Sequence, residues 1–187
     1  MSLDSLLLPF RDLFTPPTVD EVAERAPLHE RLRVTDDYLR VYQTGILGLD
    51  LAQELPVDDA KKSEVPRWAW DISIWGRADA VDVDGEFPAV LGSVFYLIGA
   101  TDSGSCIVQV SRGSHRGKLA TIPDAAIGAY KYKECSVPKA AIEDDAAADA
   151  YLAQIESENV FRLRPLTLEQ FAELRLANAV RRGRCQL

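Results

Sequence analysis

The order of sequence patterns along the 187-residue chain predicts an α+β fold, with a central, mostly antiparallel mixed sheet and with N-terminal and C-terminal helices packed on it. Three observations lead to this class. Helical patterns come first, strand patterns follow one another over residues 68–122, and helical patterns return to close the chain. An alternating βαβ fold would interleave the two kinds of pattern instead.

Size and composition favour a single domain. The chain is 47% hydrophobic and 27% charged, which is typical of a soluble globular protein of one domain. We expect this domain to span residues 1–187, with a lead-in segment over 1–17, a globular core over 18–176 and a basic tail over 177–187.

The first helix is marked by Thr18 and Glu21, which have the spacing of a capping box. In that motif the threonine side chain accepts a hydrogen bond from a free amide of the first turn, and the carboxylate accepts one in return. The motif predicts a helix over about residues 19–25. Pro27 can begin a second helix, and Thr35 can cap the next one.

Strand patterns occupy the middle of the chain. From Trp68 to Ile74 large apolar side chains recur at every second position, which favours a strand. Apolar runs separated by turn residues predict further strands at 94–98, 106–110 and 118–122.

Helical signals return after the strands. Residues 144–158 are rich in alanine and acidic in their first turn, which is typical of a helix. A second capping box, formed by Thr167 and Gln170, marks a last helix that we expect to start at Pro165.

Residues 99–106, with the sequence GATDSGSC, place two serines and a cysteine beside glycines. A nucleophile elbow needs GxSxG on a strand-to-helix turn, but Thr101 stands where the first glycine should be and a strand pattern follows. We therefore predict a hairpin tip, with Cys106 as a buried and inert side chain. The alternative is a small hydrolase-like enzyme. Its candidate residues are Ser103, Ser105, Cys106 and, as the base, His115.

Charge and residue counts exclude several kinds of partner. The net charge of −8 argues against nucleic acid, because phosphate binding needs clustered Lys and Arg, and it suits attraction to a basic protein. Three widely spaced cysteines indicate a reducing, cytoplasmic location without disulfides, and two histidines exclude a histidine-rich metal site. The longest apolar stretch falls short of the ~20 residues that cross a bilayer, so we expect no membrane partner.

Two loops share some features with cofactor or metal sites. Residues 111–118, SRGSHRGK, lack the GxxxxGK[ST] spacing of a phosphate-binding loop. Residues 79–86, DAVDVDGE, resemble a calcium loop, but Ala80 and Leu91 occupy its first and last ligand positions. We therefore expect no cofactor and no bound metal.

A partner surface is expected where aromatic and charged side chains gather, because tryptophan is enriched at binding hot spots and charged rims set the association rate. The main candidates are an acidic edge next to a tryptophan-rich strand, and a polar turn supplies a small basic patch. The residues concerned are Trp68, Trp70, Trp75, Asp79, Asp82, Asp84, Arg112, His115 and Arg116.

The chain resembles the SUKH superfamily of Smi/Knr-like proteins in the order of several short motifs. The matching segments are LHERL at residues 28–32, TDDYLRVY at 35–42 with Gly45, DSGSCIVQV at 102–110, GKL at 117–119 and TLEQFAEL at 167–174. The resemblance implies a mixed sheet with helices packed on one side and a role in binding, not catalysis. Many bacterial members look like immunity proteins that neutralise a cognate toxin, and others are regulatory scaffolds. We therefore expect a non-enzymatic module whose partner is another protein, with a basic toxin as the leading candidate.

Overall fold

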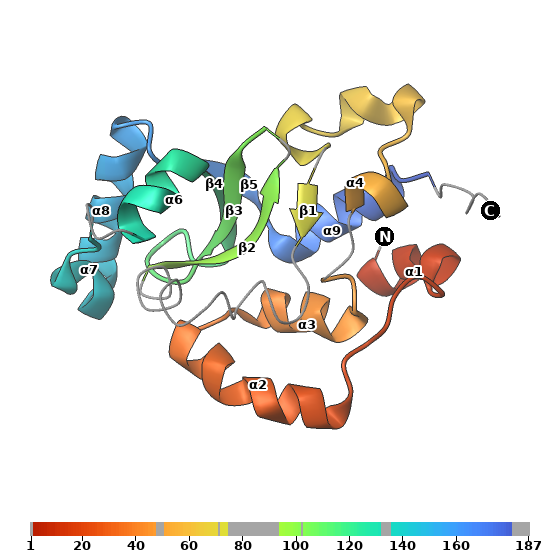
Figure 1. Cartoon of the computed structure of the whole chain (residues 1–187), viewed down its shortest axis with the longest axis horizontal. Helices are drawn as coiled ribbons and strands as arrows, with labels where there is room; N and C mark the ends of the chain where they lie inside the picture. The colour runs from red at the N-terminus through yellow and green to blue at the C-terminus, as the bar shows by residue number, and fades with distance from the viewer. Residues whose placement is uncertain are drawn as a thin grey trace.

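The computed structural model describes residues 2–47, 51–70, 72–74, 94–101, 103–131 and 136–180 (Figure 1). The fold is α+β, as the order of patterns predicts. The described strands form one antiparallel sheet of five strands, in which each strand pairs with the next one along the chain. They are β1 (Ile72–Ile74), β2 (Phe95–Thr101), β3 (Ser105–Val110), β4 (Lys118–Pro123) and β5 (Arg162–Thr167).

Helices cover both faces of the sheet, because successive side chains of each strand point to opposite faces and both sets are apolar. On one face the described helices are α1 (Leu3–Leu7), α2 (Val19–Leu32), α3 (Asp36–Thr44), α4 (Leu51–Glu54) and α9 (Leu168–Ala177). On the other they are α6 (Asp124–Lys131), α7 (Lys139–Glu143) and α8 (Asp145–Ser157), which Figure 1 shows gathered together beyond the sheet. The one-sided packing that the SUKH resemblance implies is therefore not what the structure has.

Each face of the sheet has its own hydrophobic core. Tyr96, Ile98 and Ile107 belong to the cluster under the N-terminal helices and α9. Phe95 and Val108, at neighbouring positions, belong to the cluster under α6, α7 and α8. The alternation explains why these strands appear in the sequence as continuous apolar runs.

A buried polar network joins α3, the sheet and α9. The Tyr96 hydroxyl donates to the Gln109 side-chain carbonyl, and Gln109 Nε2 donates to Asp37 Oδ2 at 2.9 Å and to the Gly117 carbonyl at 2.8 Å. The same carboxylate oxygen accepts from the Leu168 amide at 3.0 Å, at the start of α9. One carboxylate of α3 thus satisfies donors from two other elements.

The first capping box is confirmed, but the predicted helix boundary is wrong. Glu21 Oε2 accepts from the Thr18 amide at 2.6 Å, and Thr18 Oγ1 accepts from the Glu21 amide at 3.3 Å. Helix α2 then continues through Pro27 to Leu32 instead of ending before it. Pro27 and Ala23 are both exposed, so water can reach the carbonyl for which the proline has no N–H.

The predicted strand over Trp68 and Trp70 is also wrong at its start. Residues Arg67–Ala69 form a short 3-10 helix, η3, and β1 begins only at Ile72. The Ala69 amide donates to the Pro66 carbonyl at 2.8 Å, and Trp70 Nε1 donates to the Val65 carbonyl at 2.7 Å. These local hydrogen bonds take up groups that a strand would have presented to a neighbour.

The last helix starts three residues later than expected, because Pro165 belongs to β5. This strand lies at the edge of the described sheet, where a residue without an N–H is tolerated. The second capping box, between Thr167 and Gln170, is confirmed at the start of α9. Within the expected lead-in, α1 packs on α9 and buries Leu3. Of the expected tail, residues 181–187 lie outside the described part of the chain.

In the described residues no helix is both long and apolar enough to cross a bilayer.

Candidate binding site at the hairpin end of the sheet

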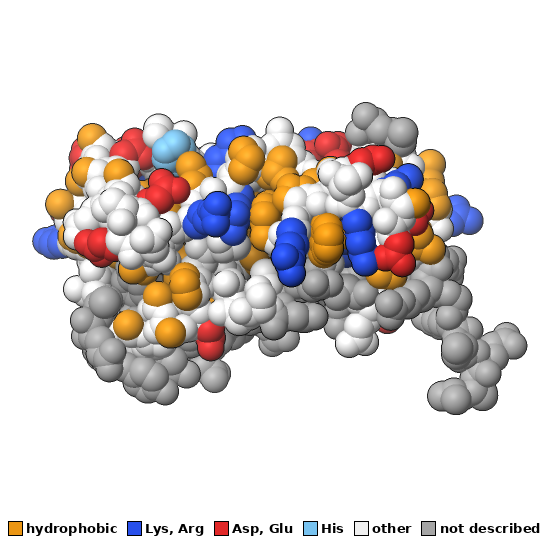
Figure 2. Space-filling view, turned by 90° about the horizontal axis from the view of Figure 1, so that it is seen from above, with side chains coloured by type: hydrophobic (Ala, Val, Ile, Leu, Met, Phe, Trp, Pro, Cys, Tyr) orange, Lys and Arg blue, Asp and Glu red, His pale blue; other side chains and the backbone are white. Residues whose placement is uncertain are grey.

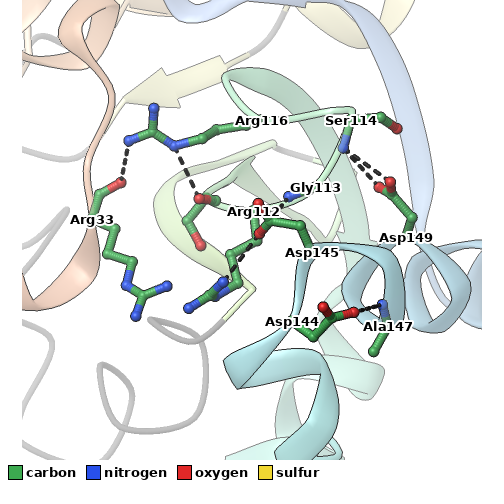
Figure 3. A network of polar contacts seen from close by, with 10 residues as sticks. Arg33, Arg112, Gly113, Ser114, Arg116, Asp144, Asp145, Ala147 and Asp149 are labelled. Carbon is green, nitrogen blue, oxygen red and sulfur yellow. Dashed lines mark hydrogen bonds and ion pairs between the residues drawn. The ribbon is translucent and has the colours of Figure 1, made fainter.

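The polar turn between β3 and β4 uses its arginines to hold the fold together (Figure 3). Arg112 is only 8% exposed, and its Nη1 donates to Asp145 Oδ1 at 3.0 Å. Arg116 donates from Nε to the Ser111 carbonyl at 3.1 Å and from Nη2 to the Arg33 carbonyl at 3.3 Å. Two of the three side chains of the predicted basic patch are therefore tied to this molecule.

Backbone amides of the same turn bind the first turns of α8. The Ser114 amide donates to Asp149 Oδ1 at 2.9 Å, and the Gly113 amide donates to Asp145 Oδ1 at 3.4 Å, as Figure 3 shows. Gly113 has a φ of +73°, and a Cβ there would lie 2.2 Å from Asp149 Oδ1, so the close approach requires a glycine. His115 stays exposed and belongs to no described contact through its side chain.

The structure does not bring the candidate nucleophiles and His115 together. Ser103 and Ser105 lie at the β2–β3 turn, whereas His115 lies in the β3–β4 turn, at the other end of β3. A strand of this length separates them by roughly 17 Å. The predicted hairpin tip is confirmed, with Gly104 at a φ of +78°.

Cys106 is buried, as expected. Its Sγ lies 3.8 Å from Asp124 Oδ1. Burial, together with the charge of this carboxylate, raises the pKa of the thiol to about 11. A thiol in this environment is protonated near neutral pH and is a poor nucleophile.

The predicted acidic edge cannot be placed. Trp75, Asp79, Asp82 and Asp84 lie outside the described residues. Of the predicted contact residues near it, Trp68 and Trp70 are described, and both are half-buried.

Trp68 lies beside a surface hollow of about 500 Å³ at the hairpin end of the sheet. Three separate segments line it: η3, the β2–β3 hairpin and β5. The lining residues are Arg67, Trp68, Thr101, Ser103, Arg162 and Arg164. Figure 2 looks onto the top of Figure 1, where the hairpin lies, and shows Lys and Arg side chains interleaved with hydrophobic ones in the middle of that face.

Arg164 is held in place at this hollow. Its guanidinium carbon lies 5.0 Å from the centroid of the Trp68 ring, a cation–π contact, and the same ring stacks on Phe171 at 5.9 Å. Arg164 Nη2 donates to Thr121 Oγ1 at 2.8 Å, while its Nε is buried without a hydrogen-bond partner. Burial, and secondly the charge of Arg162, lowers the pKa of Arg164, although the side chain stays protonated.

Arg67 and Arg162 line the hollow, and no described carboxylate forms an ion pair with either of them. Neither side chain has an ion pair or a hydrogen bond to any residue that the structure describes. A second hollow of about 590 Å³ shares Arg162 and Arg164 and is also lined by Glu156, whose Oε1 accepts from the Leu163 amide at 3.2 Å. Positive charge therefore gathers at one place on a protein whose net charge is −8.

Sequence reasoning missed Arg162 and Arg164. The sequence contains a signal for them, the pattern R-x-R at residues 162–164. Two arginines at alternate positions of a strand point to the same face and can form one basic site. The sequence patterns predict no element between the helix at 144–158 and the helix expected from Pro165, so the strand that contains this pattern is missed.

No group of three or more metal-binding side chains lies close together within the described ranges. Comparisons of the chain with protein-family models, with curated proteins and with solved structures found no match.

Proposed function

We propose that the chain is a non-enzymatic protein-binding module, and that its specific role is that of an SUKH-like bacterial immunity protein that neutralises a cognate toxin in the cytoplasm. The observation that carries the proposal is the hollow at the hairpin end, where Trp68 and Arg164 stack beside two arginines that have no described counterion.

The residue types at the hollow are those that dominate binding energy in protein interfaces. Tryptophan and arginine are enriched at hot spots, which lie near the centre of the interface and are desolvated when the partner binds. Arg164 is already fixed by Trp68 and Thr121, so its side chain loses little conformational freedom when a partner binds. A partner that covers this face would find its anchors in position.

Net charge and local charge act at different distances. At physiological salt the field of exposed charges decays over about 8 Å, so the net charge of −8 affects the approach of a basic toxin more than its final contacts. At contact, Arg67, Arg162 and Arg164 require carboxylate or carbonyl oxygens. We expect the toxin to be basic overall and to present such oxygens to the hollow.

The proposal also draws on the SUKH resemblance, which rests on the order of short motifs in the sequence. Helices α2 and α3, the β2–β3 hairpin, β4 and α9 occur in the sequence order of the SUKH-like motifs. The additional layer of α6, α7 and α8 lies on the opposite face from α9, so it does not cover Trp68, which packs on the side of α9.

Co-expression tests the role directly. The product of the gene adjacent to this one is expressed alone and then together with the chain. If it is the cognate toxin, growth arrest should be relieved by co-expression, and the two proteins should elute as one complex of defined stoichiometry.

Two charge-reversed variants locate the contact. Arg162→Glu should speed dissociation of the complex by about 10-fold or more, because a charged contact is replaced by repulsion. The matched control is Arg11→Glu, at an exposed position that lines neither hollow, which should change it less than 2-fold. Growth arrest that persists on co-expression would contradict the immunity role. Equal effects of the two variants on a complex that does form would contradict the contact site.

A further inference from the structure

We propose that Arg67, Arg162 and Arg164 form a binding site for a phosphate group in the hollow at the hairpin end of the sheet. This inference does not depend on the proposed function, because a small phosphate can bind whether or not the chain neutralises a toxin. It concerns a ligand with the chemistry of a phosphate monoester or of free phosphate.

The first argument is that the described residues supply no ion-pair partner to these arginines. Three guanidinium groups line one hollow, and none of them forms an ion pair with a described carboxylate. The proximity of two of them is unfavourable by itself, as the effect of Arg162 on the pKa of Arg164 indicates. A dianion in the hollow would turn this repulsion into two or three charge-assisted contacts.

The second argument is the contrast with the other arginines of the protein. Arg112 pairs with Asp145, Arg40 pairs with Glu169 at 2.9 Å, and buried Arg175 donates to the Leu51 and Leu55 carbonyls. For each of these three arginines the fold thus supplies at least one acceptor. At the hollow it supplies Arg164 with a single hydroxyl, that of Thr121.

The third argument is preorganisation. Arg164 is pinned between the Trp68 ring and Thr121, and its Nε remains a buried donor without an acceptor. A buried donor without a partner is unfavourable, and an oxygen supplied by a ligand is the kind of group that removes this penalty.

The composition of the hollow favours phosphate over other anions. A single carboxylate has one charge and engages one arginine in a bidentate pair, whereas a phosphate dianion carries more charge and has enough oxygens to accept hydrogen bonds from all three arginines. Hydroxyl groups at Thr101 and Ser103, which hydrogen-bond to each other at 2.8 Å, add neutral donors. Asp102, between them in the sequence, lies outside the described residues.

A stacked nucleobase is not part of the proposal. The Trp68 ring is already in contact with the Arg164 guanidinium and with the Phe171 ring. The hollow is therefore suited to the phosphate group itself.

Calorimetric titration of the full chain at low salt tests the proposal. The probes are inorganic phosphate, glycerol phosphate and acetate, with phosphate and its ester distinguishing a free anion from a monoester. We expect binding of at least one phosphate probe, at least 10-fold tighter than acetate, and a loss of about 10-fold or more in the Arg162→Gln variant. The Arg11→Gln variant, which removes the same charge outside both hollows, should bind within 2-fold of the unaltered chain.

Arg162 is exposed, so Arg162→Gln should fold normally, and a melting curve checks this. Arg164→Lys provides the second variant, since it keeps the charge but not the planar fork, and should lose about 5-fold or more in affinity. The proposal is overturned if neither phosphate probe binds, or if acetate binds as tightly as phosphate. It is also overturned if Arg162→Gln and Arg11→Gln have equal effects on binding.

Discussion

The two ends of the sheet both carry arginines, and they use them in opposite ways. In the β3–β4 turn, Arg112 donates to Asp145 and Arg116 donates to backbone carbonyls, so both side chains link segments of the fold. At the hairpin end, Arg67 and Arg162 have no described acceptor. The same residue type is a structural cross-link at one end and a candidate ligand-binding group at the other.

In this protein, a cluster of basic residues in the sequence is therefore a poor guide to a binding surface. The segment SRGSHRGK is the more conspicuous cluster, yet the start of α8 and the end of α2 meet it in the folded chain. The arginines of the hollow come from residues 67 and 162–164, nearly a hundred positions apart, and what marks them is that they line one hollow without an ion pair to a described carboxylate.

The largest expected effect concerns Cys106, at the hairpin end. With a pKa raised to about 11 from 9.0, its thiolate fraction at pH 8 should be about 100-fold lower than that of an unperturbed thiol, and burial slows access further. Iodoacetamide labelling should therefore be at least 100-fold slower in the folded chain than in urea. The measurement uses a Cys135→Ser, Cys185→Ser background so that a single thiol reacts. Rapid labelling of the folded protein would restore the hydrolase-like alternative.

The second prediction concerns the β3–β4 end of the sheet, where a substitution removes the ion pair between Arg112 and Asp145. Asp145→Ala leaves the buried Arg112 guanidinium and the Gly113 amide without their acceptor, and should lower the free energy of unfolding by about 2 kcal/mol in urea denaturation. The matched control is Asp20→Ala, which removes an exposed first-turn carboxylate of α2 and should cost less than about 1 kcal/mol.

Adding Arg112→Met to Asp145→Ala should recover part of that loss, because a buried charge without a partner is removed and the apolar stem is kept. A double variant less stable than Asp145→Ala alone would show that the pair is not the source of the effect.

A smaller change in stability is expected on acidification. It involves His29, in the last turn of α2, near the carbonyl of Arg33 that accepts from Arg116. Burial, and secondly the charge of Arg25, lowers the pKa of His29 below its usual 6.5. The unfolded chain therefore binds the proton more readily, so stability should fall as the pH drops below about 6.5 and continue to fall until the folded-state pKa is passed. His29→Gln should flatten this part of the stability curve, measured by urea denaturation between pH 7.5 and 5. An unchanged slope would assign the pH dependence to other groups.

The smallest change in the free energy of unfolding is expected for Arg162, at the hairpin end of the sheet. Since its side chain is exposed and makes no described polar contact, Arg162→Met should change the free energy of unfolding by no more than about 0.5 kcal/mol. A loss as large as that of Asp145→Ala would mean that the arginines of the two ends are alike. Melting curves of the two variants side by side decide the point.

Much of the local structure follows from neighbouring residues alone. The caps at Thr18, Thr35 and Thr167 and the turn at Gly104 were predicted and are present, because each requires side-chain and backbone groups no more than three or four positions apart. The α+β class and the apolar strands of the sheet's centre follow in the same way from periodicity and order.

The pairing of β4 with β5, the helical layers on both faces and the hollow needed the tertiary structure. Thr121 pairs with Arg162, and Trp68 lies against Arg164, only after segments far apart in the chain have packed together. Whether an arginine is neutralised depends on the acceptors that such packing brings within hydrogen-bond distance. These acceptors come from distant parts of the chain, so the residues next to the arginine in the sequence do not identify them. For that reason the residues revealed the caps and the strands, while the difference between the two arginine clusters emerged only in the folded molecule.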